Sequence, residues 1–150
     1  METAIQIQNV WKIFGNQPQV ALDAIKSKGL TKAQVLEQFD CVLAVADVSI
    51  DVNECEVFCI MGLSGSGKST LIDLIPNLRS PPKGIIQIDG HTVKNFSLKS
   101  LRQAISFVPQ NAHIFDGTVS NHIRYGKKDA TDYEVVEASR LAGANSFISN

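Results

Sequence analysis

The chain lacks long hydrophobic runs, a strong net charge and an even set of cysteines. No stretch approaches the roughly 20 apolar residues that a helix needs to span a bilayer, so any membrane role requires a partner. The 14 basic and 15 acidic residues leave a net charge of −1, which excludes the basic footprint of a nucleic-acid-binding protein. The three cysteines have no metal-ligand spacing and predict reduced thiols in the cytosol.

What is present is typical of one globular domain. The 150 residues are 44% hydrophobic, which suffices for a real core. The sequence contains no internal repeat and no low-complexity segment. His91, His113 and His122 do not have metal-ligand spacing, and we expect each to be solvated or lightly packed.

One glycine-rich stretch carries a specific chemical signal. Residues 62–69 match G-x-x-x-x-G-K-[ST], the phosphate-binding P-loop. Glycines let such a loop fold around a di- or triphosphate with its N–H groups pointing inward. Lys68 can reach the β- and γ-phosphates, and the Ser69 hydroxyl can coordinate Mg²⁺. The expected nucleotide-binding residues are Gly62, Leu63, Ser64, Gly65, Ser66, Gly67, Lys68, Ser69 and Thr70.

The flanks of the loop have the character that this motif requires. Residues 57–61 form a continuous apolar run, which predicts a strand buried on both faces with Cys59 as a small core residue. A helix-like apolar face follows the loop until Pro76 interrupts it. This order of strand, glycine loop and helix favours phosphate binding over a structural glycine turn.

The rest of the chain predicts short strands alternating with helices. Strands are expected near residues 5–10, 48–52, 85–88 and 105–108. Helices are expected at residues 18–29, 31–39, 98–104, 118–125 and 131–142. Capping boxes at Thr31–Gln34 and Thr131–Glu134 mark two of the helix starts.

Several segments resemble the ATP-binding domain of ABC transporters. Residues 5–70 resemble the ATPase subunits of glycine betaine/proline importers, in Val10–Gly15, the helical insertion near 18–40 and the P-loop segment. Residues 84–147 are more similar to ABC exporter ATPase domains, through Gly84–Gly90, Ser100–Arg102, Val108–Gln110 and residues 114–126. The resemblance implies an α/β fold of the P-loop NTPase class. Residues 1–150 would form the N-terminal part of an ABC-type ATPase domain, with an antiparallel β subdomain and an incomplete parallel core sheet with helices.

The resemblance also implies roles for residues outside the P-loop. Phe14 stands where the family places an aromatic ring that stacks on adenine, although it could instead pack locally. Gln110 matches the Q-loop glutamine, whose amide helps to position Mg²⁺ and water, and the alternative is an ordinary loop amide. Asp116-Gly117 belongs either to a loop that faces the partner or to a plain turn.

Two further functions stay open. An apolar run that ends in Asp89 is similar to a Walker B strand, and Asp89 could hold Mg²⁺ in a small self-contained P-loop kinase or NTPase. Asp89-Gly90 is also a turn dipeptide, which is the interpretation we favour. The other possibility is a non-catalytic assembly module whose P-loop is only structural.

Other features of the family do not occur in this sequence. These are the signature loop Leu-Ser-Gly-Gly-Gln, a Walker B strand ending in Asp-Glu, and a switch histidine. Phosphoryl transfer depends on such groups, so we expect a truncated or chimeric domain that binds ATP with Mg²⁺ without efficient hydrolysis. In the family the strands beside residues 57–61 come from later in the chain, so we expect bare strand edges here. Cys55 stands where the importers have a turn glycine.

The resemblance finally implies partners and a location. The expected partners are a transmembrane permease subunit or domain and a second ATPase domain, with no nucleic acid. The expected location is the cytoplasm, at the inner face of the cell membrane and held there through a partner. The transported substrate cannot be read from this sequence.

Overall fold

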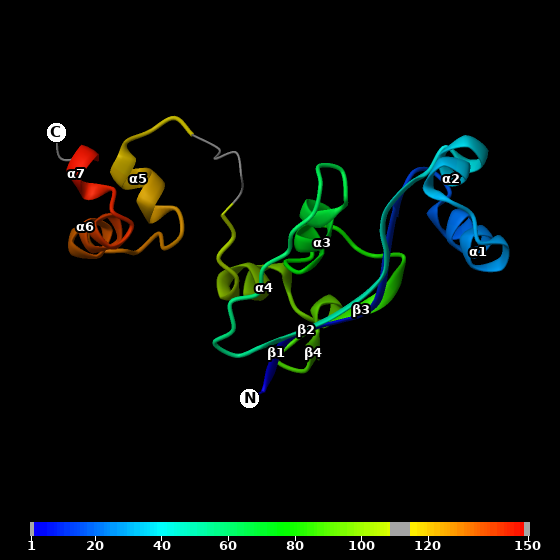
Figure 1. Ribbon diagram of the computed structural model, residues 1–150. Helices are drawn as coiled ribbons and strands as arrows, with labels where there is room; N and C mark the ends of the chain where they lie inside the picture. Colours follow the sequence, from blue (N-terminus) through cyan, green and yellow to red (C-terminus); the bar gives the residue numbers. More distant parts are fainter. Residues whose placement is uncertain (1, 109–114, 149–150) are drawn as a thin grey trace. The chain divides into compact units, whose positions relative to one another are not determined.

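The computed structural model describes residues 2–108 and 115–148 and divides into two compact units, Met1–Ser106 and Phe107–Asn150 (Figure 1). The first unit is an antiparallel sheet with helices packed on it, and the second is helical. The α/β class expected from the sequence is confirmed. Among the described residues, no helix has both the length and the apolar content of a membrane span.

The sheet has four strands in the order β2-β1-β3-β4, and every neighbouring pair is antiparallel. The strands are β1 (Thr3–Phe14), β2 (Val42–Asn53), β3 (Lys83–Ile88) and β4 (His91–Thr92). The predicted strands near 5–10, 48–52 and 85–88 are confirmed, and the first two are longer than expected. Asp89 and Gly90 form the tight turn between β3 and β4, as their dipeptide predicts.

A β-bulge at Asn9 sets which residues of β1 face the core. The register shifts between Ile7 and Val10, and Asn9 has a φ of 46°. Both Ile7 and Val10 consequently belong to the same buried cluster although they are an odd number of residues apart. The Asp47 carboxylate supports the bulge, because it accepts hydrogen bonds from the side-chain Nδ2 of Asn9 at 3.3 Å and from Trp11 Nε1 at 3.1 Å.

The main core lies between the sheet and three short helical elements. These are α3 (Lys68–Leu74), the 3₁₀ turn η1 (Val93–Asn95) and α4 (Leu98–Ala104). Leu71 and Leu74 of α3 are buried against Val45 of β2 and other sheet residues. Ser97 caps α4 and accepts a hydrogen bond from the Ser100 N–H. This packing fixes the start of α3 against the sheet.

A second core holds the helical insertion between β1 and β2. The insertion consists of α1 (Pro18–Lys28) and α2 (Lys32–Phe39), which lie together at one end of the long β1–β2 ribbon (Figure 1). Both predicted helices are confirmed, as are the left-handed Gly29 that ends α1 and the capping box of Thr31 and Gln34. The buried residues of this core are Trp11, Ile13, Ala21, Leu22, Ile25, Val35, Cys41 and Leu43.

The second unit contains α5 (Val119–Arg124), α6 (Asp132–Leu141) and α7 (Asn145–Ile148). The predicted helices near 118–125 and 131–142 are confirmed, and the capping box of Thr131 and Glu134 is formed. Phe115 stacks on His122 and Tyr125, with ring centroids 6.2 and 5.4 Å away. The rings and a pair of hydrogen bonds to His122 hold the start of this unit together.

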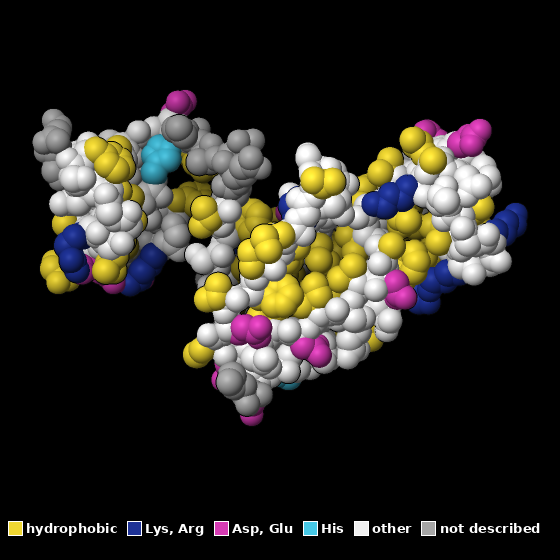
Figure 2. Space-filling view, viewed as in Figure 1, with side chains coloured by type: hydrophobic (Ala, Val, Ile, Leu, Met, Phe, Trp, Pro, Cys, Tyr) yellow, Lys and Arg dark blue, Asp and Glu magenta, His cyan; other side chains and the backbone are white. Residues whose placement is uncertain are grey.

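Two strand predictions are wrong. Residues 57–61 and 105–108 form no strand, and Val57, Met61 and Val108 are 97%, 87% and 90% exposed. Cys59 is exposed as well, so the prediction of a core cysteine is also wrong. An apolar run becomes a strand when a neighbour satisfies its backbone groups, and the described residues provide no such neighbour. Broad hydrophobic areas are visible on the surface of the sheet unit (Figure 2).

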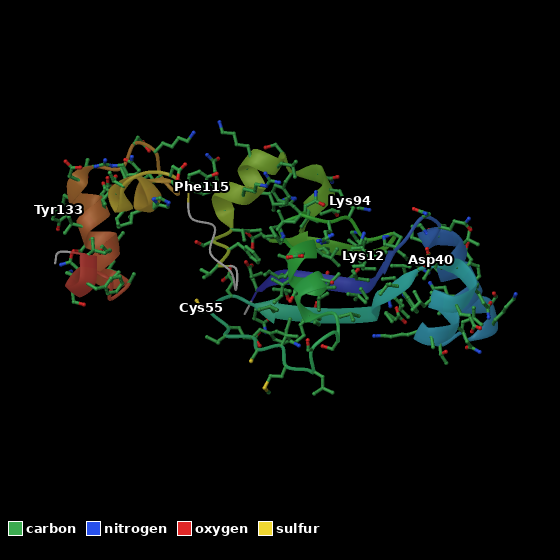
Figure 3. All side chains as sticks on the ribbon, turned by 90° about the horizontal axis from the view of Figure 1, so that it is seen from above. Lys12, Asp40, Cys55, Lys94, Phe115 and Tyr133 are labelled. Atoms are coloured by element: carbon green, nitrogen blue, oxygen red, sulfur yellow. The ribbon has the colours of Figure 1, made fainter. Side chains whose placement is uncertain are left out.

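The antiparallel subdomain is therefore present, whereas the parallel core sheet has no strand pair among the described residues. The turn before residues 57–61 also carries strain. Cys55, which is labelled in Figure 3, lies in this turn. Its φ of 59° is a left-handed conformation that glycine adopts more easily. Cys55, which stands where the importers have a turn glycine, thus adopts the backbone conformation that favours glycine.

Candidate functional site

The candidate site is the loop of residues 62–67 that leads into α3. A backbone turn closes it, since the Ser66 N–H donates to the Leu63 carbonyl at 3.2 Å. Gly67 has a φ of 93°, and a Cβ at this position would come within 2.0 Å of the Ala44 oxygen. Only glycine fits there, so the sequence requirement for Gly67 follows from contact between the loop and β2.

Lys68 folds back over this loop. Its Nζ donates to the Gly62 carbonyl at 2.6 Å and to the Leu63 carbonyl at 2.9 Å, and it lies 3.4 Å from Ser66 Oγ. The ammonium group is therefore held at the loop's own backbone, next to the first turn of α3. A phosphate that binds the N–H groups of such a loop meets this positive charge directly.

The first turn of α3 orients the remaining motif residues. The Leu71 N–H donates to the Gly67 carbonyl at 2.9 Å, and the burial of Leu71 holds the helix on the sheet. Ser69 is exposed and Thr70 is half-buried. No described residue forms a hydrogen bond with the Ser69 hydroxyl, so its oxygen is able to ligate a cation.

Phe14 lies at the end of β1, beside two positive charges. The Nζ of Lys12 is 5.1 Å from the centroid of the Phe14 ring, and the Cζ of Arg79 is 5.2 Å from it. Partial burial and, second, the charge of Arg79 lower the pKa of Lys12 from its ordinary value. Arg79 comes from the loop after α3, and no sequence motif marks either Arg79 or Lys12 as part of the site.

Other candidate residues lie elsewhere or outside the described residues. Gln110 and His113 fall outside the described ranges, so the role of Gln110 stays a prediction. Asp89 is exposed in the turn after β3, next to Ile88, which pairs with Ile5. The P-loop lies against Ala44, at a different part of the sheet. Within the described ranges, no group of three or more His, Cys, Asp or Glu side chains could hold a metal ion.

His91 and His122 are lightly packed, as the sequence analysis expects. His91 meets Phe96 edge to face at 6.1 Å. The Nε2 of His122 accepts from the Phe115 N–H at 2.9 Å, and its Nδ1 is 2.9 Å from the Thr118 carbonyl. Nδ1 therefore carries the proton, because the Thr118 carbonyl can only accept a hydrogen bond.

The family model for ABC transporters matches residues 45–149, more than half of the chain. The chain belongs to the ABC transporter family. This match begins on β2, one residue after Ala44, and includes the whole P-loop, so the glycine loop lies within the part of the chain that the family model matches. The resemblance to ABC transporters that the sequence analysis describes is therefore confirmed at the level of the family.

Two relatives from Staphylococcus aureus have names that refer to export. The chain is 44% identical over 104 residues to a protein of Staphylococcus aureus (strain NCTC 8325 / PS 47) named as a multidrug export ATP-binding/permease protein, covering 69% of this chain and 18% of the relative. A relative of the same name in strain bovine RF122 is 43% identical over the same length. This ABC transporter chain thus spans 18% of the length of these relatives. The likeness of residues 5–70 to glycine betaine importers gains no support from them.

A solved structure supports the fold of this ABC transporter chain. The structure of a bacterial Atm1-family ABC exporter with ATP bound superposes with a TM-score of 0.75 and 27% identity. It covers 99% of this chain, which in turn covers 22% of that exporter. The fold of this chain is accordingly that of part of an ABC transporter ATPase domain.

Proposed function

We propose that this chain binds ATP together with Mg²⁺ through the P-loop, as the nucleotide-binding part of an ABC transporter ATPase. The observation that carries the proposal is the position of Lys68, whose ammonium contacts the Gly62 and Leu63 carbonyls within a loop that needs glycine at position 67. Backbone N–H groups, a helix start and a lysine together form a binding site for a polyphosphate.

The residues present fit a magnesium ion in part. The exposed Ser69 hydroxyl stands at the first turn of α3, next to the loop that would hold the phosphates. Gln110 is the second expected ligand, on the basis of the family resemblance. Mg²⁺ held by these residues would neutralise part of the charge of the phosphates. Phe14 is proposed to contact the base, because an aromatic ring offers a flat apolar surface to a purine.

We further propose that this chain does not hydrolyse ATP efficiently. The sequence contains no apolar run that ends in Asp-Glu, where the family has the carboxylate that polarises water. Hydrolysis needs a group that orients the attacking water, and such groups typically contribute large factors to the rate. Asp89 gives no support to a self-contained kinase, since it occupies the β3–β4 turn.

The names of the relatives support a membrane partner. They combine ATP-binding and permease functions in one protein. We propose that this chain works at the inner face of the cell membrane with a transmembrane permease domain and a second ATPase domain, and without nucleic acid. Its net charge of −1 is consistent with the last point.

Titration calorimetry with Mg-ATP tests the proposal. Lys68→Ala should weaken binding at least about tenfold, because it removes a charge-assisted contact with the phosphates. Lys94→Ala, an exposed lysine in the same unit, is the matched control and should leave the dissociation constant unchanged. Equal binding by the wild type and Lys68→Ala would contradict the P-loop proposal. Multiple turnovers of ATP, abolished by Lys68→Ala, would contradict the proposed lack of hydrolysis.

A further inference from the structure

A cationic aromatic cluster lies beside the P-loop and is formed by Phe14, Lys12 and Arg79. Both cations are within 5.2 Å of the ring centroid. At this range the π-system attracts a positive charge, most strongly when the group is partly removed from water. Lys12 lies on the sheet (Figure 3). Arg79 reaches the ring from the loop after α3.

One contact ties the loop that follows α3 back to α3, and a second ties it to β1. Arg79 Nε donates to Asp73 Oδ2 of α3 at 3.3 Å, and Lys12 Nζ donates to the Ser80 carbonyl at 2.8 Å. The side chain of Arg79 remains 50% exposed. Because Nε makes the contact with Asp73, the terminal nitrogens of the guanidinium are available to a ligand.

The cluster is adjacent to the P-loop on the same sheet. Lys12 pairs with Val45 across β1 and β2, and Phe14 pairs with Val42. The P-loop contacts the same part of β2, since a Cβ on Gly67 would meet both Ala44 and Val45. A ligand with its phosphates at Lys68 can therefore extend along the sheet toward Phe14.

We propose that Arg79 is a positioning residue for the base of the nucleotide. The inference depends on the proposed binding of ATP. A guanidinium is planar and weakly hydrated, so it stacks on aromatic faces. Arg79 lies over Phe14 and is held by Asp73, and together the two side chains offer a purine one surface that is both aromatic and cationic. A ligand without a base gains nothing from that surface.

The competing explanation is that Arg79 only ties the loop to α3. An ion pair as exposed as this one contributes little to stability, and its loss would act on every ligand of the P-loop alike. Comparison of a ligand with a base and one without separates the two explanations.

Calorimetric titrations of the full chain with Mg-ATP and with Mg-tripolyphosphate provide that comparison. Arg79→Ala should raise the dissociation constant of Mg-ATP about three- to tenfold and that of Mg-tripolyphosphate less than about twofold. Arg79→Lys keeps the charge and can still pair with Asp73, but it lacks the planar group, so it should show the same selective loss. Arg102→Ala, an exposed arginine on α4, is the matched control and should change neither value.

Each outcome decides the role of Arg79. The proposed role of the guanidinium is overturned if Arg79→Ala weakens the binding of both ligands equally or leaves ATP binding unchanged. It is also overturned if Arg79→Lys binds ATP as the wild type does. None of these results contradicts the proposal that the chain binds ATP. If the wild type binds neither ligand, the proposed function fails as well.

Discussion

Gly67 lies directly against the backbone of Ala44, and a Cβ on Gly67 would come within 2.0 Å of the Ala44 oxygen. The contact joins the P-loop to β2. It makes the glycine a structural requirement of the fold as well as a part of the binding motif.

Gly67→Ala should therefore destabilise the protein, by about 2 kcal/mol or more, because backbone atoms must move and the φ of 93° is unfavourable for alanine. Urea unfolding followed by circular dichroism measures the loss. Gly65→Ala is the control, since Gly65 has a φ of 78° but no atom within 4 Å of the added Cβ. Equal destabilisation by the two substitutions would show that the contact with Ala44 is unimportant.

Asp47 links the two bulged strands and provides a second prediction. Its Oδ1 accepts from Trp11 Nε1 at 3.1 Å and from the Asn9 side chain at 3.3 Å. Asp47→Ala leaves the partly buried indole N–H without its partner and should cost about 1–3 kcal/mol in the free energy of unfolding. Asp47→Asn keeps an acceptor oxygen and tolerates the φ of 49°, so it should cost less. A cost for Asp47→Asn as large as that for Asp47→Ala would contradict this account.

Patterns in the sequence correctly predicted the elements that are stabilised by contacts between residues close together in the chain. The capping boxes at Thr31 and Thr131 close through contacts within each helix start, so sequence spacing suffices to find them. Asp89-Gly90 likewise forms its turn from local chemistry. Residues 57–61 need pairing with distant strands, and no local pattern tells whether such strands are available.

The candidate site likewise contains residues that a sequence motif identifies and one that only the tertiary structure brings into place. The motif identified residues 62–69 because glycine, lysine and serine act there at fixed spacing. Phe14 was found through the family resemblance. Arg79 was missed because it reaches Phe14 only after α3 has packed on the sheet, which is a tertiary relationship with no sequence spacing of its own.

The α6 capping box gives a prediction about pH. The side chain of Lys127, and then the backbone and hydroxyl of Thr131, lower the pKa of Glu134 from 4.5 to about 2. Because the folded pKa is lowered, the stabilisation is complete above about pH 4.5 and is lost as the pH falls toward 2. NMR titration of the Glu134 carboxyl should give a midpoint well below that of an ordinary glutamate.

Lys127→Ala removes the largest cause and should raise the Glu134 midpoint, while Thr131 keeps it below the ordinary value. Lys128→Ala is the matched control, because Lys128 makes none of the contacts that affect Glu134. If Lys127→Ala and Lys128→Ala raise the Glu134 midpoint equally, Lys127 is not the main cause of the lowered pKa.

The exposed segment at residues 57–61 gives the last prediction. Met61 is 87% exposed, so Met61→Lys should change the free energy of unfolding by less than about 0.5 kcal/mol. Leu71→Ala, which empties a buried position under the P-loop, should cost about 2–5 kcal/mol. Chemical unfolding of both variants makes the comparison. A large loss for Met61→Lys would mean that this segment is buried in solution, as a paired strand or against another molecule, since a lysine on an open surface has no reason to destabilise the fold.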